Sequence, residues 1–365
     1  MHFFVSVLIF LFILCFYIHL QYQYKTSNDL EIYELDYTTN KQLQEICHLK
    51  QPVLFQIDHF KEVESFFKTI SLSLVSDIKE EDVNVKDLRD YYKPNITSVD
   101  AISLSFSSAY GLMETDTKGY FFSENNSDFV RERIHDFSKI DGYLASPWII
   151  HKHYDLLFGS KNAHTPLRYH TETGRFLVIS SSYSSEEKYI RVKMIPWQNR
   201  KIETIKDYEN YEFWSPIDIW NSPPDKIRCL EFDVKEGYTL YIPPYWYYSI
   251  QFTTPSISVA SFTYSTGMNV ISNLSNIGLY FMQQNNIKNL GNWKNIKQVY
   301  FGSSSDDSER KERKEVKDEE EKEEEVKEEK KEEVKYEAKD EVKEILSVIT
   351  TKTQPQPQTQ PQPQQ

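Results

Sequence analysis

Six runs rich in aromatic and β-branched residues follow one another between residues 167 and 264, and they restrict the possible folds more than any other feature. The runs cover residues 167–181, 189–195, 230–234, 238–242, 245–252 and 256–264. Such side chains favour strands because they pack well on the pleated surface of a sheet. The chain also contains 25 Tyr and 22 Phe, which is ample apolar material for one large core. We therefore predict a mainly β fold.

Helical patterns lie on both sides of these strands. A short helix is predicted at residues 38–49, where Thr or Asn can cap the start, and Pro52 opens a strand after it. Apolar residues spaced for one helical face predict a second helix at residues 61–70. A Ser/Asp start predicts a third helix at residues 127–137. Residues 269–282 are predicted to form a closing helix that packs on the sheets.

The N-terminus contains an apolar run without a charged side chain at residues 3–20. Because roughly 20 such residues cross a bilayer, we predict a single-pass membrane anchor, followed by a linker at residues 21–35. The alternative is a cleaved signal peptide, but residues 19–25 offer no small-x-small cleavage site. No Lys or Arg precedes the run, so the side of the membrane stays open. Three sequons would matter only in a lumenal domain, at Asn95, Asn125 and Asn273.

The C-terminal composition separates a predicted domain, residues 36–300, from a low-complexity tail, residues 301–365. Residues 303–345 hold about 20 acidic and about 12 basic side chains, most of the net charge of −13. This tail is coiled-coil-like in composition, but its valines are too widely spaced for a heptad seam. We expect a solvated helix or disorder there, and an extended Gln/Pro repeat at residues 354–365.

Several functional classes are excluded by composition. The chain is acidic without a basic stripe, which argues against nucleic-acid binding, and no Gly-rich phosphate loop occurs. Three cysteines, Cys15, Cys47 and Cys229, provide no disulfide framework and leave the redox compartment open. Low Gly with abundant Ile, Asn, Lys and Tyr indicates an AT-rich genome, such as that of a giant virus or a protist.

Two short motifs point to a specific fold. Residues 165–170 read Thr-Pro-Leu-Arg-Tyr-His, and residues 237–248 read Gly-Tyr-Thr-Leu-Tyr-Ile-Pro-Pro-Tyr-Trp-Tyr-Tyr. They resemble the two metal-bearing strands of Jumonji-C/cupin-like oxygenases, which read Thr-Pro-x-His-x-Asp and Gly-Asp-x-Leu-x-Ile-Pro-x-x-Trp-x-His. The resemblance extends over residues 36–286, with further matching segments at residues 50–56, 120–125, 155–159 and 192–196.

The resemblance implies a double-stranded β-helix, a jelly-roll with a pocket between its sheets. Such relatives bind Fe(II) through two histidines and one carboxylate, and they use 2-oxoglutarate and O₂ to hydroxylate or demethylate. In this chain the three ligand positions hold Arg168, His170 and Tyr248. With Thr165 they form the predicted degenerate pocket. The lysine that binds 2-oxoglutarate has two candidate counterparts, Lys188 and Arg191, which are possible anion contacts.

These substitutions argue against iron. A guanidinium has no lone pair to donate, and about 4 Å from a dication it would be repelled by roughly 8 kcal/mol at an effective dielectric near 20. Tyr248 could bind only as phenolate, and lowering a pKa near 10 to 7 costs roughly 4 kcal/mol. We therefore expect no catalytic residue, no metal and no cofactor. A zinc cluster of His151, His153 and Asp155 is the alternative to ordinary surface or strand-end histidines.

A buried Arg168 would need an internal carboxylate or an anionic ligand. Tyr248 has a simpler interpretation, an inward aromatic residue with its hydroxyl group satisfied. We thus predict a membrane-anchored pseudo-oxygenase, a binding or scaffold module for a protein or an anionic small ligand. One alternative is an enzyme of the hydroxylase or demethylase type with an altered site, which would require an open pocket. A second is a structural component of a membrane or virion.

Overall fold

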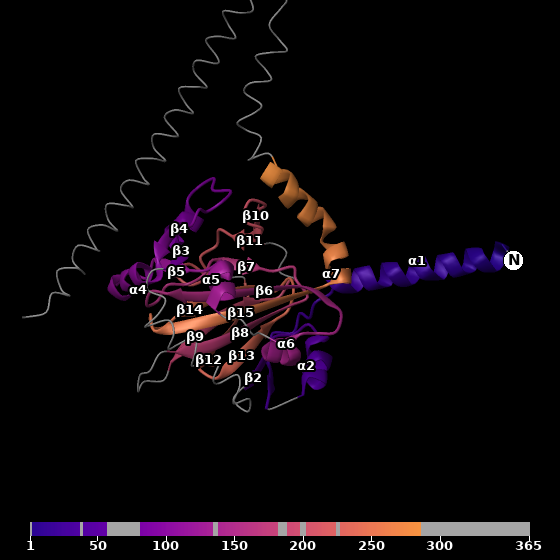
Figure 1. Ribbon diagram of the computed structural model, residues 1–365, viewed down its shortest axis with the longest axis horizontal. Helices are drawn as coiled ribbons and strands as arrows, with labels where there is room; N and C mark the ends of the chain where they lie inside the picture. Colours follow the sequence, from indigo (N-terminus) through magenta and orange to yellow (C-terminus); the bar gives the residue numbers. More distant parts are fainter. Residues whose placement is uncertain are drawn as a thin grey trace, which may run out of the picture. The chain divides into compact units, whose positions relative to one another are not determined.

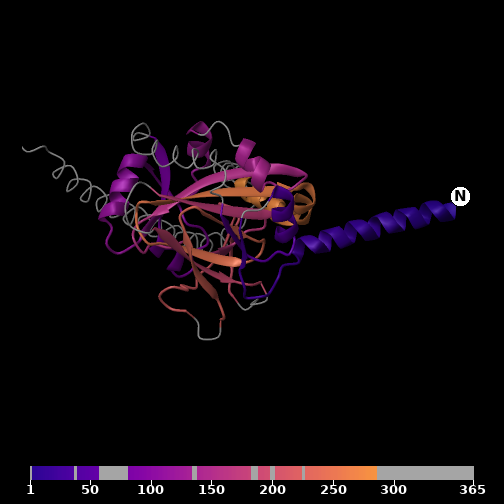
Figure 2. The ribbon, with the colours of Figure 1, turned by 90° about the horizontal axis from the view of Figure 1, so that it is seen from below.

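The computed structural model describes residues 2–36, 39–56, 81–133, 138–181, 188–197, 202–223 and 227–285. In this part the protein is mainly β, with two sheets that lie as two layers (Figure 1, Figure 2). Every strand pair is antiparallel except β1 with β2. The prediction of a mainly β fold is confirmed.

The nine-stranded sheet has the order β1 (Tyr33–Leu35), β2 (Val53–Gln56), β13 (Tyr238–Ile242), β8 (Gly174–Ser181), β15 (Ile257–Thr266), β6 (Ile149–Gly159), β5 (Phe121–Ser123), β3 (Asp82–Asp87) and β4 (Ile102–Ser105). The six-stranded sheet has the order β10 (Ile205–Asp207), β11 (Glu212–Ser215), β7 (Leu167–Tyr169), β14 (Tyr247–Phe252), β9 (Tyr189–Ile195) and β12 (Leu230–Lys235). From β6 to β9, and again from β12 to β15, the chain changes sheet at each strand. Segments close in sequence therefore face each other across the core.

The core between the sheets is formed by strands in which inward-facing and outward-facing side chains alternate. In β9, Ile190, Val192 and Met194 are fully buried, and they pack in one apolar cluster with Leu177 of β8 and Val259 of β15. Successive side chains of a strand point to opposite faces, so this period-two pattern fixes which face of β9 meets the other sheet. A separate aromatic cluster, which includes Tyr169 and Tyr245, lies outside this core.

Most predicted strands are confirmed. The predicted bounds of β9 and β13 agree with the structure, and β12, β14 and β15 differ from prediction by one or two residues at an end. The single strand predicted at residues 167–181 is wrong, because it divides into β7 and β8 in different sheets. Between them the backbone turns a corner, where the Tyr245 N–H donates to the His170 carbonyl.

The described helices are α1 (His2–Tyr24), α2 (Asn40–Cys47), the 3-10 helix η1 (Leu88–Tyr92), α4 (Phe106–Thr115), α5 (Ser127–Arg133), α6 (Ser138–Leu144), α7 (Gly267–Ser272) and a further helical stretch at residues 274–285. The prediction at residues 38–49 is confirmed, with Thr39 and Gln42 forming a capping box. The closing helix is present but interrupted at Asn273. The helix predicted at residues 61–70 and the tail lie outside the described residues.

Helix α1 is long and apolar enough to cross a membrane, and none of its residues is buried. Its C-terminal end is tied to the folded domain. Lys50 Nζ donates to the carbonyl oxygens of Tyr22 at 2.5 Å and Gln23 at 3.2 Å, and the Tyr24 hydroxyl donates to the Ser272 carbonyl. The segment predicted as a linker, residues 21–35, thus contains the end of α1 and also strand β1.

Candidate functional site

A cavity of about 650 Å³ lies between the two sheets. Strands β6, β7, β8 and β14 contribute polar walls, which include His153, Arg168, Arg175 and Tyr248. Helix α7 and residues 277–281 contribute a wall with apolar side chains, which include Tyr280. A concave site of this size, with apolar surface and convergent polar groups, is typical of small-ligand binding.

Arg168 lies in β7, where it pairs in register with Tyr248 of β14. Its Nη1 is 2.5 Å from Oε2 of Glu124, a carboxylate that is 1% exposed. Glu124 follows β5 directly, so the nine-stranded sheet supplies the carboxylate to an arginine of the six-stranded sheet. Of the two partners left open for Arg168, the internal carboxylate is therefore the one present.

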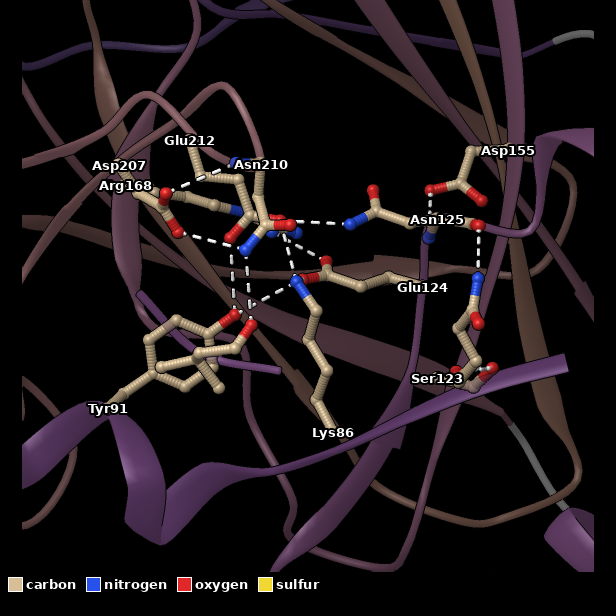
Figure 3. Close-up of polar contacts among 12 residues, drawn as sticks. Lys86, Tyr91, Ser123, Glu124, Asn125, Asp155, Arg168, Asp207, Asn210 and Glu212 are labelled. Carbon is tan, nitrogen blue, oxygen red and sulfur yellow. Dashed lines mark hydrogen bonds and ion pairs between the residues drawn. The ribbon is translucent and has the colours of Figure 1, made fainter. Parts of the chain in front are cut away.

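The ion pair belongs to a buried network (Figure 3). Lys86 Nζ lies 3.1 Å from Glu124 Oε1 and 2.6 Å from Glu212 Oε1. Burial would raise the pKa of Glu124, but Arg168 and Lys86 outweigh it and lower the pKa to about 2. Burial would likewise lower the pKa of Lys86, but Glu124 and Glu212 raise it well above its ordinary value. The four charges compensate one another, as buried charges must.

His170 follows β7 and also lines the cavity. Its Nε2 donates to the Ile242 carbonyl oxygen at 2.9 Å, so the proton of the neutral ring is on Nε2. Burial lowers the pKa of His170. Its Nδ1 lies 3.3 Å from Oε2 of Glu172. Burial would raise the pKa of Glu172, yet the positive charge of Arg175 holds it below its ordinary value.

Tyr248 is bonded to a residue that the sequence analysis did not select. Arg175 Nη1 donates to the Tyr248 hydroxyl oxygen at 2.5 Å, and Arg175 Nε donates to Thr263 Oγ1 at 3.2 Å. In the sequence, Arg175 could have been recognised as a charged side chain at an inward position of an apolar strand. It is two residues from Leu177, and both line the cavity. Tyr248 forms part of the wall and does not fill the space.

The other predicted pocket residues lie elsewhere. Thr165 is fully buried, and its hydroxyl oxygen accepts from the Ile250 N–H at 3.1 Å, which fastens β14. Lys188 is buried and Arg191 is 40% exposed in an ion pair with Asp233, and neither lines the cavity. Their prediction as anion contacts of this pocket is therefore corrected: Arg191 lies on the face of β9 opposite to Ile190 and Val192, and Lys188 precedes β9 and does not line the cavity.

The zinc alternative fails in the described part of the chain. His151, His153 and Asp155 all line the cavity. However, Asp155 accepts three backbone N–H bonds, from Asn125 at 3.0 Å, Asn126 at 2.6 Å and Leu156 at 2.8 Å. Among the described residues, no group of three or more His, Cys, Asp or Glu side chains could hold a metal ion.

No model of a known protein family matches this sequence, and a search of curated proteins finds no relative. The resemblance carried by the two motifs therefore stays a prediction.

Proposed function

We propose that this protein is a membrane-anchored pseudo-oxygenase of the Jumonji-C/cupin-like type, whose cavity binds a ligand without iron chemistry. Strand order supports the jelly-roll part of this proposal. Strands β13, β8, β15 and β6 are neighbours in one sheet, and β12, β9, β14 and β7 are neighbours in the other. The connections cross between the two groups in the manner of a double-stranded β-helix.

The observation that carries the proposal is the Arg168–Glu124 ion pair at 2.5 Å. By the resemblance, Arg168 stands where the first iron ligand would be, and its guanidinium repels a cation and offers no lone pair. His170 already donates through Nε2, and the Tyr248 hydroxyl already accepts from Arg175. These residues do not fit Fe(II).

The anchor is supported by the contacts of α1. A cleaved signal peptide would leave the domain, yet the end of α1 contacts Lys50 and Ser272 by hydrogen bonds, and Tyr24 packs against the ring of Tyr245 at 6.1 Å. We therefore expect the mature protein to retain α1 and to sediment with membranes.

The enzyme alternative keeps one supporting observation. Tyr245 and Trp246 do not line the cavity, so the space that catalysis would require is open. To decide between the two functions, the full-length protein in detergent is incubated with Fe(II) and 2-oxoglutarate in air. The pseudo-oxygenase predicts no 2-oxoglutarate consumption above that of an Arg168→Ala variant. Consumption that exceeds that of the reagents without protein, and that disappears in this variant while circular dichroism shows the variant to be folded, would establish the enzyme instead.

A further inference from the structure

Two opposite charges on the cavity wall, Arg175 and Glu172, stabilise each other's charged form, yet within the described residues they form no direct ion pair with each other. Other ionised groups there are matched: Arg168 contacts Glu124, Glu212 contacts Lys86, and Asp155 accepts backbone N–H bonds. Within the described residues, Arg175 donates hydrogen bonds to two hydroxyl oxygens, those of Thr263 and Tyr248. An arginine has five N–H donors, so donors remain for a ligand.

Glu172, in contrast, has another hydrogen-bond acceptor beside its carboxylate. Its Oε2 accepts the Thr171 N–H at 3.0 Å and lies 3.3 Å from His170 Nδ1. Because His170 carries its proton on Nε2, Nδ1 is an acceptor, and it is buried without a hydrogen-bond partner. Two acceptors therefore face each other at close range. A donor group with several protons placed beside them would satisfy both.

The rest of the cavity favours an apolar portion of the ligand. Val270, Ile277, Tyr280 and Phe281 line it from the C-terminal helices, and Tyr211 lines it from the six-stranded sheet side. The rings of Tyr211 and Tyr280 are in edge contact, with centroids 5.6 Å apart. Aromatic walls of this kind bind apolar side chains through area burial and edge contacts.

We propose that the cavity binds a free α-amino acid with an apolar or aromatic side chain, its carboxylate on Arg175 and its ammonium on Glu172 and His170. This inference rests on the proposed function and specifies its ligand class. A simple anion would satisfy Arg175 but would add charge near Glu172. A zwitterion compensates both groups, and a small ligand can contact both, because Arg175 and Glu172 are three residues apart in the chain and line the same cavity.

The test is isothermal titration calorimetry on the full-length protein in detergent, with L-phenylalanine and L-leucine as probes. Phenylpropionate, which lacks the amine, and phenethylamine, which lacks the carboxylate, are the matched analogues. We expect saturable binding of at least one amino acid, and binding at least about tenfold weaker for each analogue, because each loses a charge-assisted hydrogen bond. This comparison needs no variant.

Arg175→Gln and Glu172→Gln should each weaken amino-acid binding about tenfold or more. The matched control is Arg191→Gln, which removes an arginine whose ion pair with Asp233 lies outside the cavity and should leave binding unchanged.

Equal binding of phenylpropionate and phenylalanine would overturn the proposal, since a proton shared by His170 and Glu172 would then explain their contact. Absence of binding by both amino acids would also overturn it. Neither result would contradict the pseudo-oxygenase proposal. That proposal is contradicted only by iron binding or by turnover of 2-oxoglutarate.

Discussion

Replacement of Glu124 by glutamine should strongly destabilise the protein. The side chain keeps its shape, but Arg168 and Lys86 lose the carboxylate that both contact. Removing one partner of a buried ion pair typically costs about 3–5 kcal/mol, because the other charge stays buried and unpaired. The pKa of Glu124, lowered from its ordinary value of 4.5 to about 2, has the direction that such a stabilising ion pair requires.

The pH dependence has a defined sign. A carboxylate with a depressed pKa contributes stability above its unfolded-state pKa, and this contribution is lost as the pH falls through the folded-state value. For Glu124 the loss should occur between about pH 4.5 and about pH 2. Glu124→Gln should be less stable than wild type at neutral pH, and the difference between the two proteins should shrink across this window.

The assay is urea unfolding of the full-length protein in detergent, followed by tryptophan fluorescence. Asp90→Asn is the control, because Asp90 pairs with Lys93 at 2.7 Å on the surface, and such pairs contribute about 1 kcal/mol or less. If Glu124→Gln loses no more stability than Asp90→Asn, or if its deficit is unchanged at low pH, the reasoning about the buried network is refuted.

Three further predictions concern packing, thiol reactivity and the N-terminus. Gly159→Ala should lower the free energy of unfolding by roughly 1–3 kcal/mol in thermal unfolding, because the new Cβ would lie 2.6 Å from the Phe252 ring. The control Gly142→Ala has open space around its new Cβ in α6, so its stability should be unchanged or higher. Equal losses in the two variants would contradict this reasoning. Burial raises the pKa of the Cys47 thiol, so maleimide should modify it only after unfolding, and rapid native labelling would be inconsistent. Intact-mass analysis of membrane-extracted protein should find α1 retained, and a mass lacking it would support a signal peptide.

Local sequence pattern predicted β2, β9 and β12 to β15, whose packing is periodic, but it missed β1, β3, β4, β5, β6, β10 and β11. Residues 189–195 and 238–242 alternate or run apolar between clear turn signals, and the structure places β9 and β13 there. The same pattern could not divide residues 167–181 between two sheets, since propensity does not say which sheet a strand joins. β6 was missed because His and Lys interrupt its first half, although its second half is buried.

The site was predictable only in part. The requirement of Arg168 for a partner follows from its chemistry, but Glu124 lies far away in sequence and meets it only across the sheets. Arg175 carried a local signal, a charge inside an apolar strand. Lys188 and Arg191 were chosen as candidates because the alignment of this strand with the family motif was uncertain. A shift of that alignment by one residue moves every side chain to the other face of the strand.

Metal content tests the central claim most directly. The full-length protein, purified in detergent without chelator, is analysed by mass spectrometry for bound metals and then titrated anaerobically with Fe(II) and 2-oxoglutarate. Because Arg168 with Glu124 occupies the expected ligand position, the account predicts metal far below one equivalent and no cofactor-dependent spectral change. About one iron per chain, or a spectral change that requires both additions, would contradict it and establish an oxygenase with an unusual ligand set.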